Sequence, residues 1–154
     1  ALDEAFDRLA PPVENEDPER AARQLFDWVR EHIQPSAYDA ADRGALYALL
    51  HQKGDCTEYT ALFVALCRRA GIPARAMGGY VVSRNTVLHP GAYHNWAEFF
   101  ANDGWHLADP LSGVWMDHGD SYVATRVVGT SDTPLGDFPR FRYLGDGIKV
   151  VMSK

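Results

Sequence analysis

The chain has 154 residues, of which 46% are hydrophobic and 12% aromatic, which is enough apolar material for one core but not comfortably for two. Fifteen Lys and Arg against twenty-one Asp and Glu give a net charge of -6 without any basic stripe, which argues against a nucleic-acid partner. No stretch approaches the ~20 consecutive apolar residues of a membrane-spanning helix, and the first thirty residues lack a signal-like apolar region. We expect one soluble domain over residues 1–154. Because the chain begins with Ala1 rather than Met, we expect a processed form or a domain of a larger protein, and the compartment stays open.

The N-terminal part of the chain has a helical pattern. Residues 1–16 are interpreted as a polar approach segment with a short helix at residues 2–9. Asp17 followed by Pro18 is typical of a helix start, and apolar residues then recur at helical spacing as far as Pro35. A loop leads to a short apolar segment at residues 45–50.

A second amphipathic helix is predicted to begin at Asp55. Asp55 as the N-cap and Glu58 three residues later form an acidic version of the capping box, and Gly71 with Pro73 ends the helix. Its predicted apolar face consists of Tyr59, Leu62, Phe63, Leu66, Cys67 and Ala70. If both cysteines lie on this helix, the eleven residues from Cys56 to Cys67 separate them by about 16 Å, too far for a disulfide. We therefore expect two free thiols.

After this helix the pattern changes to short strand-like runs. They are predicted at residues 74–82, 93–100, 105–109, 121–128, 138–144 and 148–152. The turn sequences at residues 102–104 and 145–147 favour hairpins, so most of the sheet should be antiparallel. Helices followed by strands predict the α+β class, in which N-terminal helices pack on an antiparallel sheet.

Cys56 falls in the first turn of the second helix, a position that favours a nucleophilic thiol. The unpaired N–H groups of a helix N-terminus favour a thiolate and can also hold an oxyanion. Asp55 and Glu58 oppose this effect because they are acidic neighbours, so a basic partner is needed. The alternative is that Cys56 is a small buried hydrophobe, the usual role of a free cysteine.

His94 and Asp109 supply a candidate partner on the two strands that flank the turn at residues 102–104. With a four-residue loop at 101–104, Phe100 pairs with Trp105, and His94 lies diagonal to Asp109 on one face of the sheet. A tight turn at residues 103–104 would separate the two side chains. The triad hypothesis therefore requires the longer loop.

Several other residues have competing interpretations. Cys67 is expected in the core, His106 on the face opposite Asp109, and His51, His89 and His118 in or near loops. A metal site at the triad lacks a close ligand pair, so none is expected. Trp96, Trp105 and Trp115 suit either the core or the wall of a cleft. Gly78 and Gly79 within a strand indicate either close approach of another backbone, such as a substrate, or a bulge.

Three motifs in order resemble those of the transglutaminase-like superfamily. The segment 54–59, GDCTEY, with the run from Leu62 to Arg75, is similar to that family's nucleophile segment. HNWAE at residues 94–98 resembles its histidine motif and WHLADP at residues 105–110 its aspartate motif. The agreement of order and spacing extends across residues 44–110.

The resemblance implies a papain-like core with Cys56, His94 and Asp109 as catalytic triad, acting on peptide or protein substrates. It identifies no second oxyanion donor, for which Gln52, Tyr38 and Trp28 are candidates, with Trp96 as a cleft candidate. No cofactor or metal is expected, since no EF-hand-like acidic loop is found.

The expected activity is a cysteine-dependent acyl transfer on amide bonds, ending in protease- or deamidase-type hydrolysis or in transglutaminase-type transfer. One alternative is a catalytically silent peptide-binding module of the same fold. The other is an acyltransferase that takes its acyl group from a thioester cofactor.

Overall fold

The computed structural model describes residues 2–13, 17–39, 41–129 and 148–150. Helices dominate its first half, with α1 (Leu2–Leu9), α2 (Pro18–His32), β1 (Gln34–Pro35), α3 (Gly44–His51), β2 (Lys53–Gly54) and α4 (Cys56–Arg69). Strands follow, with β3 (Ala74–Val81), β4 (Thr86–Leu88), η1 (Pro90–Ala92), β5 (Tyr93–Ala101), β6 (Gly104–Asp109), β7 (Val114–Trp115), η2 (Gly119–Ser121), β8 (Tyr122–Val128) and β9 (Ile148–Val150). The predicted α+β order is confirmed.

The helices form where local sequence signals start and stop them. The Asp17 side chain accepts a hydrogen bond from the Arg20 N–H at 2.9 Å, and Pro18 opens α2 as predicted. Residues 45–50, predicted only as an apolar segment, lie in α3. The N-terminal segment contributes more than a polar approach, because Phe6 of α1 is buried in the core.

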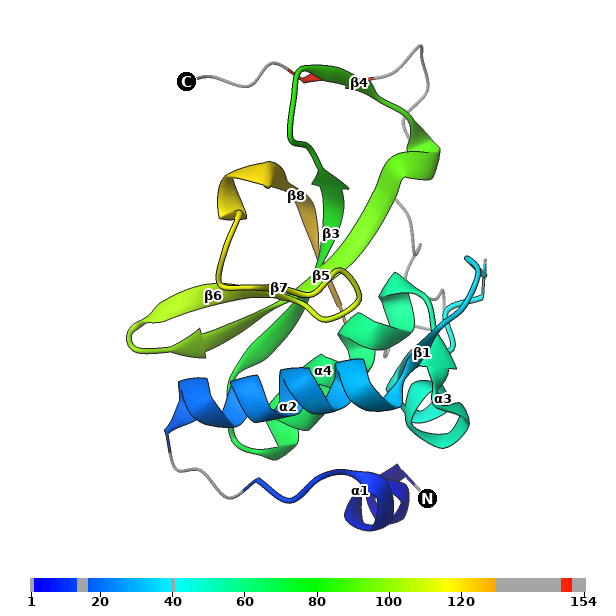
Figure 1. Ribbon diagram of the computed structural model, residues 1–154, viewed down its shortest axis with the longest axis vertical. Helices are drawn as coiled ribbons and strands as arrows, with labels where there is room; N and C mark the ends of the chain where they lie inside the picture. The colour runs from blue at the N-terminus through cyan, green and yellow to red at the C-terminus, as the bar shows by residue number, and fades with distance from the viewer. Residues whose placement is uncertain (1, 14–16, 40, 130–147, 151–154) are drawn as a thin grey trace.

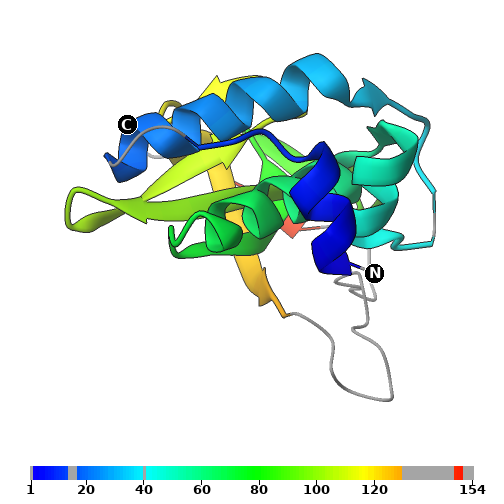
Figure 2. The same ribbon diagram turned by 90° about the horizontal axis from the view of Figure 1, so that it is seen from below.

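A five-stranded sheet with the order β7-β6-β5-β3-β8 forms the second layer, and all of its pairings are antiparallel. Helices α2 and α4 pack on one face of it, as Figures 1 and 2 show. The short pairs β1 with β2 and β4 with β9 lie outside this sheet. The predictions of a strand at 138–144, a turn at 145–147 and a strand end at 151–152 lie outside the described residues.

The hairpin of β5 and β6 has the register on which the triad hypothesis depends. Phe100 pairs with Trp105, as predicted, but Ala101 also pairs with Gly104. The turn is therefore Asn102 and Asp103 alone, shorter than the predicted four-residue loop. Both turn residues have positive φ, 49° and 63°, a conformation that Asn and Asp tolerate and that matches the twist of the strands.

The glycines at 78 and 79 are explained by approach of the chain to itself. The pairing of β3 with β8 shifts register between them, which is the predicted bulge. A Cβ on Gly78 would lie 1.8 Å from the Tyr93 hydroxyl, and one on Gly79 would lie 2.1 Å from the Val123 carbonyl oxygen. No larger residue fits between these groups without displacing them.

The core lies between the helices and the sheet. It includes Leu62, Phe63 and Cys67 of α4 against Ala97 and Phe99 of β5. Cys67 is fully buried, as predicted, and both cysteines are free thiols. In the described ranges, no helix has the length and apolar character to cross a membrane.

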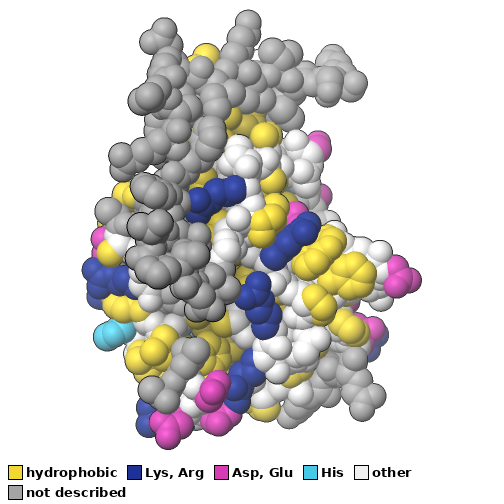
Figure 3. Space-filling view, turned by 180° about the vertical axis from the view of Figure 1, so that it is seen from behind, with side chains coloured by type: hydrophobic (Ala, Val, Ile, Leu, Met, Phe, Trp, Pro, Cys, Tyr) yellow, Lys and Arg dark blue, Asp and Glu magenta, His cyan; other side chains and the backbone are white. Residues whose placement is uncertain are grey.

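Some large apolar side chains remain at the surface. Phe100, Trp105 and Val127 are all exposed, and Arg75 lies over the Trp105 ring at 4.1 Å from its centroid. Figure 3 shows apolar and basic side chains interspersed on one face of the molecule. Trp105 is therefore a surface residue, whereas Trp96 is buried and Trp115 is half-buried against Phe99.

Candidate active site

Cys56 is the first residue of α4, where a capping box fixes the start of the helix. The Asp55 carboxylate accepts from the Thr57 N–H at 2.8 Å, and the Glu58 carboxylate accepts from the Asp55 N–H at 3.0 Å. Gly54 makes room for the returning Glu58 side chain, because a Cβ there would lie 2.2 Å from the Glu58 Cβ. The half-buried Cys56 thiol is thereby held at the positive end of the helix dipole.

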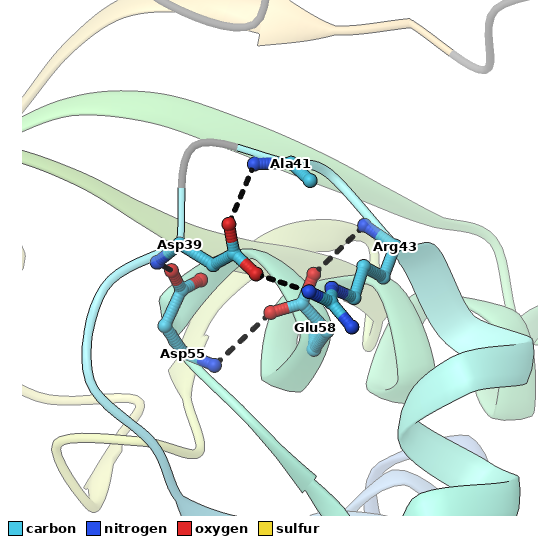
Figure 4. A network of polar contacts seen from close by, with 5 residues as sticks. All are labelled: Asp39, Ala41, Arg43, Asp55 and Glu58. Carbon is cyan, nitrogen blue, oxygen red and sulfur yellow. Dashed lines mark hydrogen bonds and ion pairs between the residues drawn. The ribbon is translucent and has the colours of Figure 1, made fainter.

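The same two carboxylates hold the loop at residues 36–43 against the helix start (Figure 4). Asp55 accepts from the Asp39 N–H and Glu58 from the Arg43 N–H, each at 3.0 Å. Burial raises the pKa of Glu58, and the N–H groups of Arg43 and Asp55 partly offset this by stabilising its charged form. Both acidic side chains beside Cys56 are thus engaged by backbone donors.

His94 and Asp109 are in direct contact. His94 Nε2 and Asp109 Oδ2 lie 2.7 Å apart, and Asp109 is fully buried. Burial raises the pKa of Asp109, but its bond to His94, the His94 charge and the Ser112 N–H outweigh burial, and the pKa is lowered. Asp109 is therefore a carboxylate with fixed donors around it.

The His94 imidazole has Cys56 as a second partner. Burial lowers the pKa of His94, but hydrogen bonds to Asp109 and Cys56, together with their charges, outweigh burial and raise the pKa to about 9. The structure thus brings the three predicted residues together from α4, β5 and β6.

The other candidates are placed differently. Trp96 is buried behind His94, with ring centroids 6.4 Å apart and planes inclined by 24°. Trp28 stacks on His32 within α2, Gln52 is exposed at the end of α3, and Tyr38 is exposed within the loop at 36–43. The oxyanion roles of these last three residues stay predictions.

Among the described residues, the remaining histidines form no such pair with a buried carboxylate. His106 contacts the Ala101 carbonyl oxygen at 2.8 Å, and the exposed His118 lies 3.5 Å from Asp117, which is also exposed. Within the part of the chain that the structure describes, no group of three or more His, Cys, Asp or Glu side chains could hold a metal ion.

Two contacts at the site were not predicted from the sequence. Tyr122 of β8 donates to Asp109 Oδ2 at 2.8 Å, and the Asn95 amide donates to Thr57 Oγ1 at 3.1 Å. Asn95 adjoins His94 within a motif and could have been suspected on that ground. Tyr122 lies beyond all three motifs, and no local signal marks it.

His94 faces a cleft of about 600 Å³. The cleft is lined by residues that include Val81, Tyr93, Ser112, Val114 and Tyr122. Its walls are thus a mixture of apolar, aromatic and hydroxyl side chains beside the imidazole.

Comparisons with solved structures show the same fold. A Cytophaga hutchinsonii protein provisionally named a cysteine protease matches 96% of this chain and 55% of its own, at TM-score 0.56 and 22% identity. A TGase matches 71% of this chain and 29% of its own, at TM-score 0.51 and 15% identity. Calcium-bound LapG of Legionella pneumophila matches 82% of this chain and 71% of its own, at TM-score 0.56 and 12% identity.

This chain therefore spans only about half or less of the first two proteins. No curated protein matches it significantly in sequence. The model of the transglutaminase-like superfamily matches residues 7–110, more than half of the chain and the part that contains the Cys56, His94 and Asp109 motifs. The chain belongs to the transglutaminase-like superfamily.

Proposed function

We propose that the protein is a cysteine-dependent enzyme that acts on amide bonds of peptides or proteins through a thioester on Cys56. The observation that supports this most is the arrangement around His94, whose Nε2 lies 2.7 Å from the buried Asp109 while Cys56 is its second partner. A nucleophile, a base and an orienting carboxylate in this order form a triad.

In the acylation step, Cys56 Sγ attacks the carbonyl carbon of the amide as its proton resides on His94. The carbonyl oxygen gains negative charge, which the N–H groups at the start of α4 stabilise. The C–N bond then breaks, and the His94 imidazolium gives its proton to the leaving amine or ammonia. A thioester remains on Cys56.

In the second step, His94 takes a proton from water or from an amine, which attacks the thioester carbonyl. The C–S bond breaks, the acyl group leaves as an acid or a new amide, and the proton returns to the Cys56–His94 pair. Asp109 holds the imidazole ring in place and stabilises its charged form in both steps.

We expect hydrolysis to exceed transfer to amines in simple buffer. Water is in great molar excess, so transfer requires a site that binds the amine and excludes water. Ser83 and Gly91 line the cleft beside His94, which makes residues 83–91 a candidate cover, whereas most of the second candidate, residues 129–136, lies outside the described residues. The test supplies a glutamine peptide together with a labelled primary amine at millimolar concentration and quantifies conjugate and free acid by mass. Predominant conjugate would contradict the expected preference for hydrolysis.

The proposed function is tested by intact-mass detection of the acyl-enzyme after mixing with a peptide library. We expect a mass increase that maps to Cys56 and decays as free acid or new amide is released. Cys56→Ala should give no adduct, and His94→Ala should form it much more slowly. Absence of any adduct with peptide, glutamine and ester donors would remove the proposal in favour of a silent binding module.

A further inference from the structure

Tyr122 reaches the candidate site from a strand that carries none of the three motifs. It is the first residue of β8, which is separated from β6 in the sheet by β5 and β3. Its hydroxyl donates to Asp109 Oδ2 at 2.8 Å, and the same oxygen lies 2.7 Å from His94 Nε2. The other oxygen, Oδ1, accepts from the Ser112 N–H at 3.1 Å.

The fold places this hydroxyl through close packing. The Tyr122 ring meets Trp96 edge to face at 5.1 Å between centroids, and Trp96 in turn stacks behind His94. The absence of a side chain at Gly79 lets β8 approach β3, since a Cβ there would meet the Val123 carbonyl oxygen and the Trp96 ring. Tyr122 is thus fixed by its ring, independently of its hydroxyl.

We propose that Tyr122 is a positioning residue that shares the Asp109 carboxylate with His94 and so sets the pH range over which His94 carries its proton. The proposal rests on the proposed function, in which His94 is the acid and base. Two donors on one carboxylate oxygen divide its negative charge, so the Tyr122 bond weakens the hold of Asp109 on the imidazolium.

The electrostatic surroundings agree with this role. Burial and the neighbouring Asp109 charge both raise the pKa of Tyr122, so that its hydroxyl stays protonated and can donate throughout the neutral range. The titratable groups that face His94 are Asp109 on β6 and Cys56 on α4, while Tyr93 and His118 line the same cleft. Besides His94, Asp109 is bonded by the Tyr122 hydroxyl and by Ser112, through its backbone N–H and its side chain.

The test is Tyr122→Phe, which keeps the ring against Trp96 and removes only the hydroxyl. We expect the midpoint of the His94 titration, followed by NMR of the imidazole without substrate, to rise by about half a unit to one unit. The pH at which kcat/KM declines on the alkaline side should rise by the same amount. Tyr47→Phe, which removes a hydroxyl from α3, where the Tyr47 ring contacts His51, should leave both unchanged.

A double variant separates tuning from general damage. In an Asp109→Asn background, adding Tyr122→Phe should shift the His94 titration no further, because the shared carboxylate is gone. An unshifted His94 titration in Tyr122→Phe alone, or an equal shift in both backgrounds, would overturn the proposal. Because the titration needs no substrate, it can succeed even if no thioester is ever found, in which case the proposed function fails and the Tyr122 contact stands.

Discussion

Thr57→Val tests how the nucleophile helix and the histidine strand are held together. Thr57 follows Cys56 and Asn95 follows His94, so the 3.1 Å bond between their side chains joins the neighbours of the two reacting groups. Asn95 is buried, and its Oδ1 atom already lacks a hydrogen-bond partner among the described residues. Valine keeps the shape of threonine but leaves the Asn95 amide without this acceptor.

Two effects of different size are expected. Leaving a buried donor unpaired should lower the free energy of unfolding by about 1–3 kcal/mol, which corresponds to about 2–4 °C in Tm for each kcal/mol at this chain length. A shift of about 1 Å between sulfur and imidazole can cost up to ~100-fold in rate. We therefore expect a decrease in kcat/KM well beyond what the small unfolded fraction could produce.

The assay compares kcat/KM and thermal unfolding across matched variants. Thr57→Ser retains the hydroxyl and should keep most of the activity. The reasoning is refuted if Thr57→Val loses stability while its kcat/KM remains that of the wild type.

Three further predictions follow from the same geometry. Because the pKa of His94 is raised from 6.5 to about 9, protonation of His94 stabilises the folded state fully below pH 6.5, and this stability is lost as pH rises through about 9. Denaturant unfolding at several pH values should show the loss in wild type but not in His94→Gln. Gly78→Ala should destabilise the protein and slow the reaction, because the new Cβ displaces the Tyr93 hydroxyl, and Tyr93→Phe should partly restore both stability and rate. Gly119→Ala, whose new Cβ would have no atom within 4 Å, should change unfolding and activity little in the same assays. Asp109→Asn should retain more kcat/KM than His94→Ala, because losing an orienting carboxylate costs less than losing the base; the reverse order would exclude Asp109 from that role.

The sequence sufficed for the parts of the site that local rules determine. Asp55 and Glu58 predict the capping box that places Cys56, because capping depends on residues three positions apart. The pairing of Phe100 with Trp105 brings His94 and Asp109 together, because register follows from the turn. Even there the turn was shorter than predicted, since Asn102 and Asp103 both adopt a left-handed backbone.

What escaped prediction depends on contacts between distant segments. Tyr122 contacts Asp109 because β8 pairs with β3, and no sequence motif predicts that pairing. The carboxylates of Asp55 and Glu58 also hold the loop at residues 36–43, whereas the local sequence pattern predicts only their role in the helix cap. Such contacts follow from packing of the whole chain and leave no periodic or compositional trace.

The most direct test of the central claim is the rate at which iodoacetamide alkylates Cys56 at pH 6, followed by peptide mapping. An ordinary thiol, with a pKa near 8.5, is less than about 1% ionised at that pH, so it reacts slowly. If Cys56 shares its proton with His94, it should react at least about ten times faster than free cysteine in wild type, and His94→Ala should abolish that advantage. The buried Cys67 should remain unlabelled as an internal check on folding. Labelling of Cys56 at the rate of free cysteine, or labelling unaffected by His94→Ala, would contradict the account.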